Sequence, residues 1–182
     1  MKDQDFVNII DVIPDAVICL KYATNDNFVG ERFYSSPDAY LRYGTAKKLI
    51  RAADILREQG CRIKIWDAYR PAAAQFRLWE ILPDSDYVAN PNICFSCHTR
   101  GNAVDITLTD TNGNELEMPS AFDEFSDKAN RDYSDATETA RANAEALEKA
   151  MKESGFVEYY EEWWHYEDTV DYPPEQDLFS RI

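Results

Sequence analysis

Residues 102–109 read Asn-Ala-Val-Asp-Ile-Thr-Leu-Thr, and apolar and polar side chains alternate from Val104 onward. Because successive side chains of a β-strand point to opposite faces, Val104, Ile106 and Leu108 would share one face, and Asp105 would lie on the other with two threonines. An apolar face of this kind packs on a core. We therefore predict a strand here whose polar face can present the Asp105 carboxylate to a pocket.

Predicted helices and predicted strands both occur on either side of this strand in the sequence. They follow one another without a regular strand–helix–strand repeat, and there is no internal repeat or linker, which predicts a single α+β domain over residues 1–182. A loop over 83–97 and an Asn-Gly turn within 111–114 separate some of them. The predicted strands are 16–20, 62–69 and two short ones within 156–166, and the predicted helices are 45–59 with Thr45 as its cap, 72–82, and one from Ser134 or Asp135 to Glu153.

Length and charge limit the classes of function. The chain has 182 residues, of which 45% are hydrophobic and 13% aromatic, so it can bury a core and does not fit a disordered protein. Its 19 Lys and Arg against 34 Asp and Glu give a net charge of −15. Binding to nucleic acid or to an anionic membrane surface needs a basic face, so this balance argues against both partners.

The N-terminal region lacks the features of an export or membrane segment. The longest apolar run, 16–20, is far shorter than the roughly 20 residues that a membrane-spanning helix needs. Asp11 and Asp15 interrupt the stretch where a signal peptide would carry its apolar core. We therefore expect a cytoplasmic protein, with a periplasmic or secreted location as the alternative if a leader has been removed. The four cysteines are too few for a disulfide framework, although a single Cys94–Cys97 bridge would fit an oxidising compartment.

The chain has two histidines, and both lie among residues of the types that bind metals. His98 precedes Asp105 by seven positions, and His165 follows a Glu-Glu-Trp-Trp run. A catalytic zinc site needs three nitrogen or oxygen ligands and leaves a fourth position for water. A single histidine is more often structural than a ligand, but His98, Asp105 and His165 together would supply the set. These three residues are therefore a candidate set of ligands for one Zn²⁺ per chain, which their types and spacing alone leave open.

Glu162 is the candidate general base, because a carboxylate beside a zinc-bound water can take its proton and pass it to the leaving amine. It lies three residues before His165, a spacing that puts both side chains on one face of a helix. On a regular strand they would face opposite ways, so a strand would need a bulge or a bend at Trp163. The sequence leaves both conformations open.

The same residues also allow other assignments. Glu162 can belong to a solvated acidic face, and Arg70, at the predicted junction of a strand and a helix, can form a structural ion pair. The stretch from Cys94 to His98 matches the Cys-x-x-Cys-His pattern of covalent haem attachment, although that chemistry requires export. Cys97 could also bind a structural zinc beside His98.

Four segments, in the same order, resemble motifs of the D-alanyl-D-alanine dipeptidases, which are zinc peptidases related to D,D-carboxypeptidases and to the hedgehog signalling domain. They read Lys-Tyr-Ala-Thr-Asn-Asp-Asn-Phe-Val-Gly at 21–30, Trp-Asp-Ala-Tyr-Arg-Pro at 66–71, Ser-Cys-His-Thr-Arg-Gly-Asn-Ala-Val-Asp-Ile-Thr-Leu at 96–108 and Glu-Trp-Trp-His-Tyr at 162–166. The resemblance covers most of the chain.

The resemblance implies zinc-dependent hydrolysis of D-Ala-D-Ala, a cell-wall precursor, to two D-alanines. It implies one Zn²⁺ per chain, bound by His98, Asp105 and His165. It also implies Glu162 as general base and acid and Arg70 as the group that stabilises the oxyanion. A Phe-Asp pair ending at Asp123 aligns with one whose carboxylate holds the substrate ammonium, and Tyr22 and Ser96 match positions near the substrate. The implied fold is a small antiparallel sheet flanked by helices, as in hedgehog and D,D-peptidase domains.

Two alternative functions stand beside this one. The first is a D,D-carboxypeptidase that acts on peptidoglycan stem peptides. The second is a non-catalytic module that binds zinc or a c-type haem, and the presence of both Glu162 and Arg70 argues against it. For the dipeptidase, the partner would be a small dipeptide, and a homo-oligomer is compatible with the sequence.

Overall fold

The predicted 102–109 strand forms the middle of a five-stranded sheet in the computed structural model, which describes residues 1–85 and 87–180. The strand order is β2-β4-β5-β7-β6, and this strand is β5. All neighbours are antiparallel except β2 and β4, which are parallel and are joined by the long connection that a parallel pair requires. The bounds are β2 Val17–Ile18, β4 Arg62–Asp67, β5 Ala103–Thr109, β6 Phe156–Tyr159 and β7 Glu162–Asp168.

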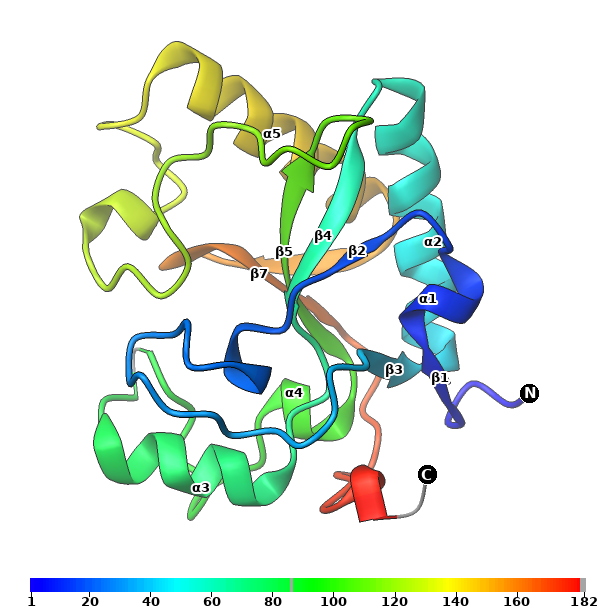
Figure 1. Ribbon diagram of the computed structural model, residues 1–182, viewed down its shortest axis with the longest axis vertical. Coiled ribbons are helices and arrows are strands. Elements are labelled where there is room, and N and C mark those ends of the chain that lie inside the picture. Colours follow the sequence, from blue (N-terminus) through cyan, green and yellow to red (C-terminus); the bar gives the residue numbers. More distant parts are fainter. Residues whose placement is uncertain (86, 181–182) are drawn as a thin grey trace.

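Two long helices pack together on this sheet (Figure 1). They are α2 (Tyr43–Glu58) and α5 (Glu138–Glu153). Each buries an apolar stripe, with Leu49 and Leu56 on α2 and Leu147 on α5 fully buried. Helices layered on a largely antiparallel sheet confirm the α+β class that the sequence predicts.

Both helices begin away from the predicted caps. α2 starts two residues earlier than predicted, and the hydroxyl of Thr45 donates instead to Asp168 at 2.8 Å. α5 is capped by Thr137, two residues after the predicted Asp135, and the Thr137 hydroxyl accepts from the Ala140 amide at 3.1 Å. Several side chains near each start are able to cap a helix, so the tertiary contacts decide which one does.

Shorter elements lie at the end of the sheet where β4 stops and β5 starts (Figure 1). α3 (Ala72–Ile81) follows Pro71 as predicted. α4 (Cys97–Arg100) begins inside the stretch 83–97 that the sequence assigns to a loop, because a helix of four residues has no readable periodicity. Asp86 in that stretch, and 181–182 of the predicted domain, lie outside the described residues. The remaining elements are β1 Phe6–Asn8, α1 Ile9–Val12, η1 Lys21–Ala23, β3 Tyr40–Arg42, η2 Asp127–Ala129 and η3 Leu178–Ser180.

A buried arginine ties distant parts of the chain to α4. Arg42 ends β3, which pairs with β1 in a separate two-stranded sheet. Its guanidinium donates to the carbonyls of Gln4, Arg100 and Pro173 at 2.6, 2.9 and 2.6 Å, and it lies 4.1 Å from the centre of the Phe6 ring. The contact with Arg100 holds the end of α4 in place.

An irregular register between β4 and β5 turns a carboxylate toward the polar face. Ile65 pairs with Ile106, but the next pair is Asp67 with Asp105, so Trp66 is an extra residue in β4. An extra residue of this kind is a β-bulge, which re-aims the side chains that follow it. Asp67 therefore lies beside Asp105 in neighbouring strands.

A second irregularity, between β6 and β7, settles the conformation around Glu162. One step along β6, from Glu158 to Tyr159, corresponds to four steps along β7, from Tyr166 to Glu162. The segment is therefore a bulged strand and not a helix. The extra residues of β7 end at His165, and they allow Glu162 and His165 to face the same way.

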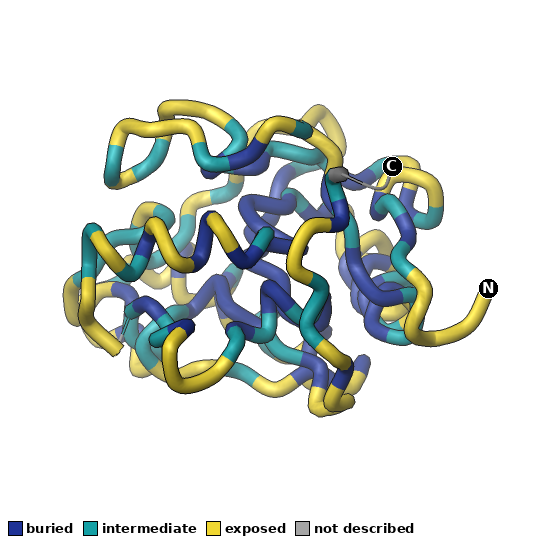
Figure 2. Tube along the Cα trace, turned by 90° about the horizontal axis from the view of Figure 1, so that it is seen from below, coloured by how far each residue is buried: buried dark blue, intermediate teal, exposed yellow. Residues whose placement is uncertain are grey.

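The buried residues form one core, and exposed residues lie around it (Figure 2). Among the described helices, none is long and apolar enough to cross a membrane. All four cysteines are free thiols, so Cys94 and Cys97 are not bridged in this structure.

We predict that Thr137→Ala lowers the free energy of unfolding by about 1 kcal/mol, because the first turn of α5 loses its cap. Thr137→Ser keeps the hydroxyl and should stay closer to the native protein. Urea unfolding followed by circular dichroism measures the difference. Equal midpoints for the native protein and the alanine variant would contradict the assigned cap.

Candidate active site

Three ionisable side chains line up across neighbouring strands of the sheet. Asp67 on β4 lies opposite Asp105 on β5, and Asp105 lies opposite His165 on β7. Directly opposed residues of antiparallel strands have neighbouring side chains, and His165 Nδ1 lies 2.9 Å from Asp105 Oδ1. The sheet therefore fixes two of the three predicted metal ligands relative to each other.

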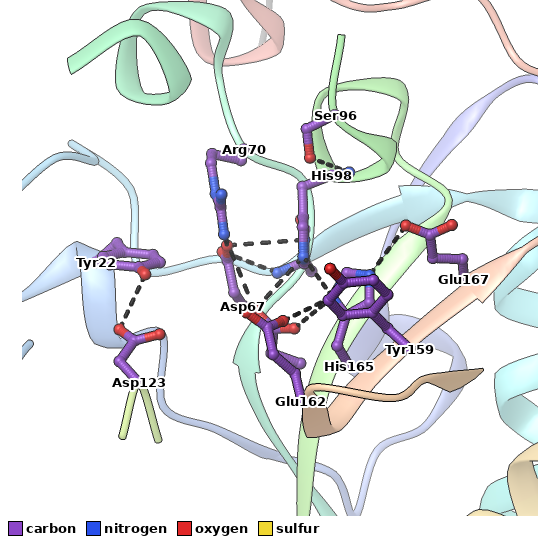
Figure 3. A network of polar contacts seen from close by, with 12 residues as sticks. Tyr22, Asp67, Arg70, Ser96, His98, Asp123, Tyr159, Glu162, His165 and Glu167 are labelled. Carbon is purple, nitrogen blue, oxygen red and sulfur yellow. Dashed lines mark hydrogen bonds and ion pairs between the residues drawn. The ribbon is translucent and has the colours of Figure 1, made fainter. Parts of the chain in front are cut away.

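α4 brings the third predicted ligand, His98, to this point. The Ser96 hydroxyl caps the helix by accepting from the His98 amide at 3.2 Å, and Gly101 ends it with a φ of 77°, in the left-handed region. His98 Nε2 lies 3.2 Å from His165 Nδ1 and 3.4 Å from Asp105 Oδ2. One ligand atom from each of the three buried residues lies within 4.8 Å of the others. Figure 3 shows the two imidazoles turned toward each other.

The outward nitrogens of both imidazoles have partners, which leaves the inward nitrogens free to bind a cation. His98 Nδ1 donates to the Ala68 carbonyl at 2.8 Å, and His165 Nε2 donates to Glu167 Oε1 at 3.0 Å. In neutral rings the inward nitrogens then present lone pairs toward each other and toward Asp105. Three converging electron-pair donors in a buried place need a positive charge between them, so these residues fit a zinc ion.

The closeness of these ionisable groups also shifts their pKa values. Burial alone would raise the pKa of Asp105, but the imidazoles of His98 and His165 lower it. Burial alone would lower the pKa of His165, but hydrogen bonds to Asp105 and Glu167 raise it to about 10. The cluster therefore favours a positive charge at this point, whether a proton or a metal ion carries it.

The cysteines next to His98 do not join the cluster. Burial raises the pKa of the Cys97 thiol to about 12, which disfavours the thiolate that zinc would bind. Cys94 is exposed. Both ring nitrogens of His98 face groups within the protein, so the geometry assigns this histidine to the buried cluster and not to a haem.

Glu162 lies beside the cluster at the start of β7. Its Oε2 is 3.9 Å from His165 Nδ1, and its side chain is 13% exposed. Burial raises the pKa of Glu162 to about 7, although the nearby His165 acts in the opposite direction. A carboxyl group with a pKa near neutrality can both accept and donate a proton at physiological pH.

Arg70 is held beside the cluster by residues whose role the sequence did not reveal. Asp67 Oδ2 accepts from Arg70 Nε at 2.9 Å and from Nη2 at 2.7 Å, and Gln75 Oε1 accepts from Nη1 at 2.9 Å. The fully buried Asp67 also accepts from the Tyr34 hydroxyl at 2.9 Å. Arg70 Nη2 lies 3.9 Å from Asp105 Oδ2, so the guanidinium charge is fixed next to the predicted metal ligands.

Asp123 faces the same site from the connection between β5 and α5 (Figure 3). Its φ of 56° is in the left-handed region, which is uncommon for a residue other than glycine. The Tyr22 hydroxyl donates to Asp123 Oδ2 at 2.9 Å. Burial, reinforced by Asp105, raises the pKa of Asp123 well above its usual range. A partly buried carboxyl in this situation is stabilised when a positively charged group binds beside it, so Asp123 suits the ammonium of a ligand.

A cavity of about 260 Å³ joins these groups. Small-molecule sites are typically about 300–1,000 Å³, so this cavity suits a small ligand. Aromatic rings, including those of Phe125 and Trp164, form part of its wall. The predicted site residues all line it: Tyr22, Arg70, Ser96, His98, Asp105, Asp123, Glu162 and His165.

Three supporting residues were missed by the sequence analysis. Glu167 had a usable signal, because it lies two positions after His165, where a regular strand returns to the same face. The sequence does not show that Asp67 binds Arg70, because this bond depends on the bulge in β4. Gln75 carries no signal in the sequence, since its contact with Arg70 follows from the turn between β4 and α3.

The fold and the site fit a metal-dependent hydrolase. Residues 2–180 match a peptidase family model described as D-ala-D-ala dipeptidase, and the chain belongs to this family of metallopeptidases. The chain is similar to the D-alanyl-D-alanine dipeptidase of Escherichia coli (strain K12), with 35% identity over 97% of this chain and 92% of that protein. It is also similar to the D-alanyl-D-alanine dipeptidases of Enterococcus faecium, with 32% identity over 80% of this chain and 82% of that protein, and of Streptomyces coelicolor, with 32% identity over 87% and 88%.

We predict that zinc binding at pH 7 releases about one proton per ion, because the metal displaces the proton from His165, whose pKa is raised to about 10 in the metal-free protein. The proton competes more strongly as the pH falls, so zinc affinity should fall with it. Titration calorimetry in two buffers of different ionisation enthalpy measures the released proton. A binding heat that is the same in both buffers would count against this competition.

Proposed function

We propose that the protein hydrolyses D-Ala-D-Ala to two molecules of D-alanine in a zinc-dependent reaction. The observation that carries this proposal is that the His98–Asp105–His165 cluster, Glu162 and Arg70 line one small cavity. The family match and the names of the relatives support the choice of substrate.

We assign the chemical roles from the geometry of the site. Zinc bound by the three ligands would lower the pKa of a bound water to about 7. Glu162 takes the proton of the attacking water and later gives it to the nitrogen of the leaving amine. As the water oxygen bonds to the carbonyl carbon, the carbonyl oxygen becomes an oxyanion, which the Arg70 guanidinium stabilises. The C–N bond then breaks and two D-alanines form.

The charge on Arg70 is suited to this role because it is fixed before the substrate arrives. Asp67 and Gln75 hold the guanidinium through three hydrogen bonds. A preorganised donor needs no rearrangement when the negative charge develops, which is the source of most electrostatic catalysis.

Asp123 would select a dipeptide by binding its free ammonium. The Tyr22 hydroxyl orients the carboxyl group, and the ammonium would supply a positive partner for this partly buried residue. Ser96 lines the cavity near the same ligand. In a longer peptide, an amide would replace the ammonium, and Asp123 would be left buried without a counter-charge.

Asp123 disfavours one of the two alternatives, and Glu162 disfavours the other. A D,D-carboxypeptidase that acts on peptidoglycan stem peptides would bring an uncharged amide to Asp123. A non-catalytic zinc module would have no use for Glu162, whose pKa is raised to about 7 beside the cluster. The cytoplasmic location, the lack of nucleic-acid and membrane partners, and the compatibility with a homo-oligomer remain predictions from the sequence.

A comparison of substrates tests this function. We expect the zinc-loaded protein to release D-alanine from D-Ala-D-Ala and to lose this activity when a chelator removes the metal. N-acetyl-D-Ala-D-Ala lacks the ammonium, and a stem pentapeptide ending in D-Ala-D-Ala lacks it at this position, so both should react at least 100-fold more slowly, which is about 3 kcal/mol of lost binding or catalysis. Faster release from the pentapeptide would favour the carboxypeptidase, and zinc binding without any hydrolysis would favour the binding module.

We predict that Glu162→Gln lowers kcat by about 10²- to 10⁴-fold, because the amide cannot accept the proton of the attacking water. Zinc content should stay at the native level, since Glu162 is not one of the three ligands. Glu161→Gln, one residue earlier, is the matched control and should keep both properties. Normal turnover by Glu162→Gln would remove this residue from the mechanism.

A further inference from the structure

Arg131 lies in the long connection between β5 and α5, which is coloured green to yellow in Figure 1. Its backbone amide donates at 3.0 Å to the carbonyl of Tyr160, between β6 and β7. Its side chain is 5% exposed. The connection therefore docks on the turn that leads directly into Glu162.

The guanidinium uses all five of its N–H groups, and three of them bind backbone carbonyls of the irregular stretch. Nη2 donates to the carbonyls of Glu162 at 3.0 Å and His165 at 2.8 Å, and Nε donates to that of Tyr159 at 2.7 Å. Nη1 donates to the Tyr166 hydroxyl at 3.0 Å and to the Glu148 carboxylate at 3.3 Å.

The carbonyls of Glu162 and His165 lie at the two ends of the bulge in β7. Glu162 is its first paired residue, and His165 is the last extra residue before the pairing with β6 resumes at Tyr166. One nitrogen atom of Arg131 binds both ends. The separation of the two ends along the bulge is therefore set by a single rigid group.

The shape of the arginine side chain allows it to bind these backbone carbonyls at the same time. Its guanidinium is flat and carries five donors in a fixed fork, whereas lysine has three donors at one point. The Tyr166 ring lies 4.4 Å from the guanidinium carbon and supports the plane. A lysine at this position would reach some of the carbonyls, but it could not bind both ends of the bulge and Tyr159 together.

We propose that Arg131 is a positioning residue that fixes Glu162 and His165 relative to each other by holding both ends of the bulge. The effect on Glu162 as a base rests on the proposed function. The effect on His165 as a metal ligand does not depend on any substrate, and it can be measured separately.

A purely structural role would give a different result. In that case, loss of Arg131 would lower the stability of the protein and leave the folded fraction with native metal affinity and turnover. A positioning role requires that the folded variant binds zinc more weakly and turns over more slowly, even where its stability is sufficient.

The test is Arg131→Lys, with Arg131→Gln as a second variant. We expect the zinc dissociation constant, measured by chelator competition, to rise about 10- to 100-fold, and kcat for D-Ala-D-Ala to fall by a similar factor, as for other residues that orient metal ligands. KM should stay within about twofold, because Arg131 does not line the cavity. The visible spectrum of the cobalt-substituted protein should also change, since His165 shifts at the metal.

Glu148→Gln is the matched control, because it removes the ion pair with Nη1 and leaves the three carbonyl contacts intact. We expect this variant to be less stable, with native zinc affinity, cobalt spectrum and kcat. Native zinc affinity and spectrum in folded Arg131→Lys would overturn the proposal, as would the failure of both Arg131 variants to fold at 10 °C. If the native protein binds zinc but does not cleave D-Ala-D-Ala, the proposed function fails, while weaker zinc binding by Arg131→Lys still supports the inference.

Discussion

Asp105 and His165 lie opposite each other on β5 and β7, and the rest of the site depends on this register. A slip of one residue in either strand would send one of these side chains to the other face of the sheet. The same slip would move the fully buried Val104 and Ile106 off the core, so the hydrophobic effect opposes it. The packing that forms the core therefore also keeps two of the proposed metal ligands together.

The sequence predicts the residues proposed for the chemistry more completely than the residues that hold them in place. The alternation along 102–109 is sufficient to place Asp105 on the polar face of a strand. The spacing of Glu162 and His165 fits a helix and a bulged strand equally well, and the pairing with β6 shows the bulged strand. The Arg131 contacts to its two ends come from another part of the chain and leave no signal in the sequence. Strand β1 and helix α4 were missed because elements of three or four residues carry too little periodicity.

Among the described residues of the site, the buried carboxylates of Asp67 and Asp105 have close partners, and the partly buried Asp123 differs from them. Asp67 has Arg70, and Asp105 has His165, so the cost of removing each charge from water is offset by a close opposite charge or a shared proton. Asp123 has a hydroxyl in place of a positive partner. Its strained backbone and raised pKa are costs that the folded protein carries in the absence of a ligand, and such costs are characteristic of binding sites.

The Arg42 contacts and the position of His165 also constrain how the protein is made. During translation His98 and Asp105 leave the ribosome before His165, and the Pro173 carbonyl that Arg42 binds follows later still. A nascent chain therefore cannot close the cluster until β7 has emerged. Until then one edge of β5 lacks its neighbour, and an unpaired edge invites pairing with other chains. The growing polypeptide passes through a stage in which shielding of that edge would favour correct folding over aggregation.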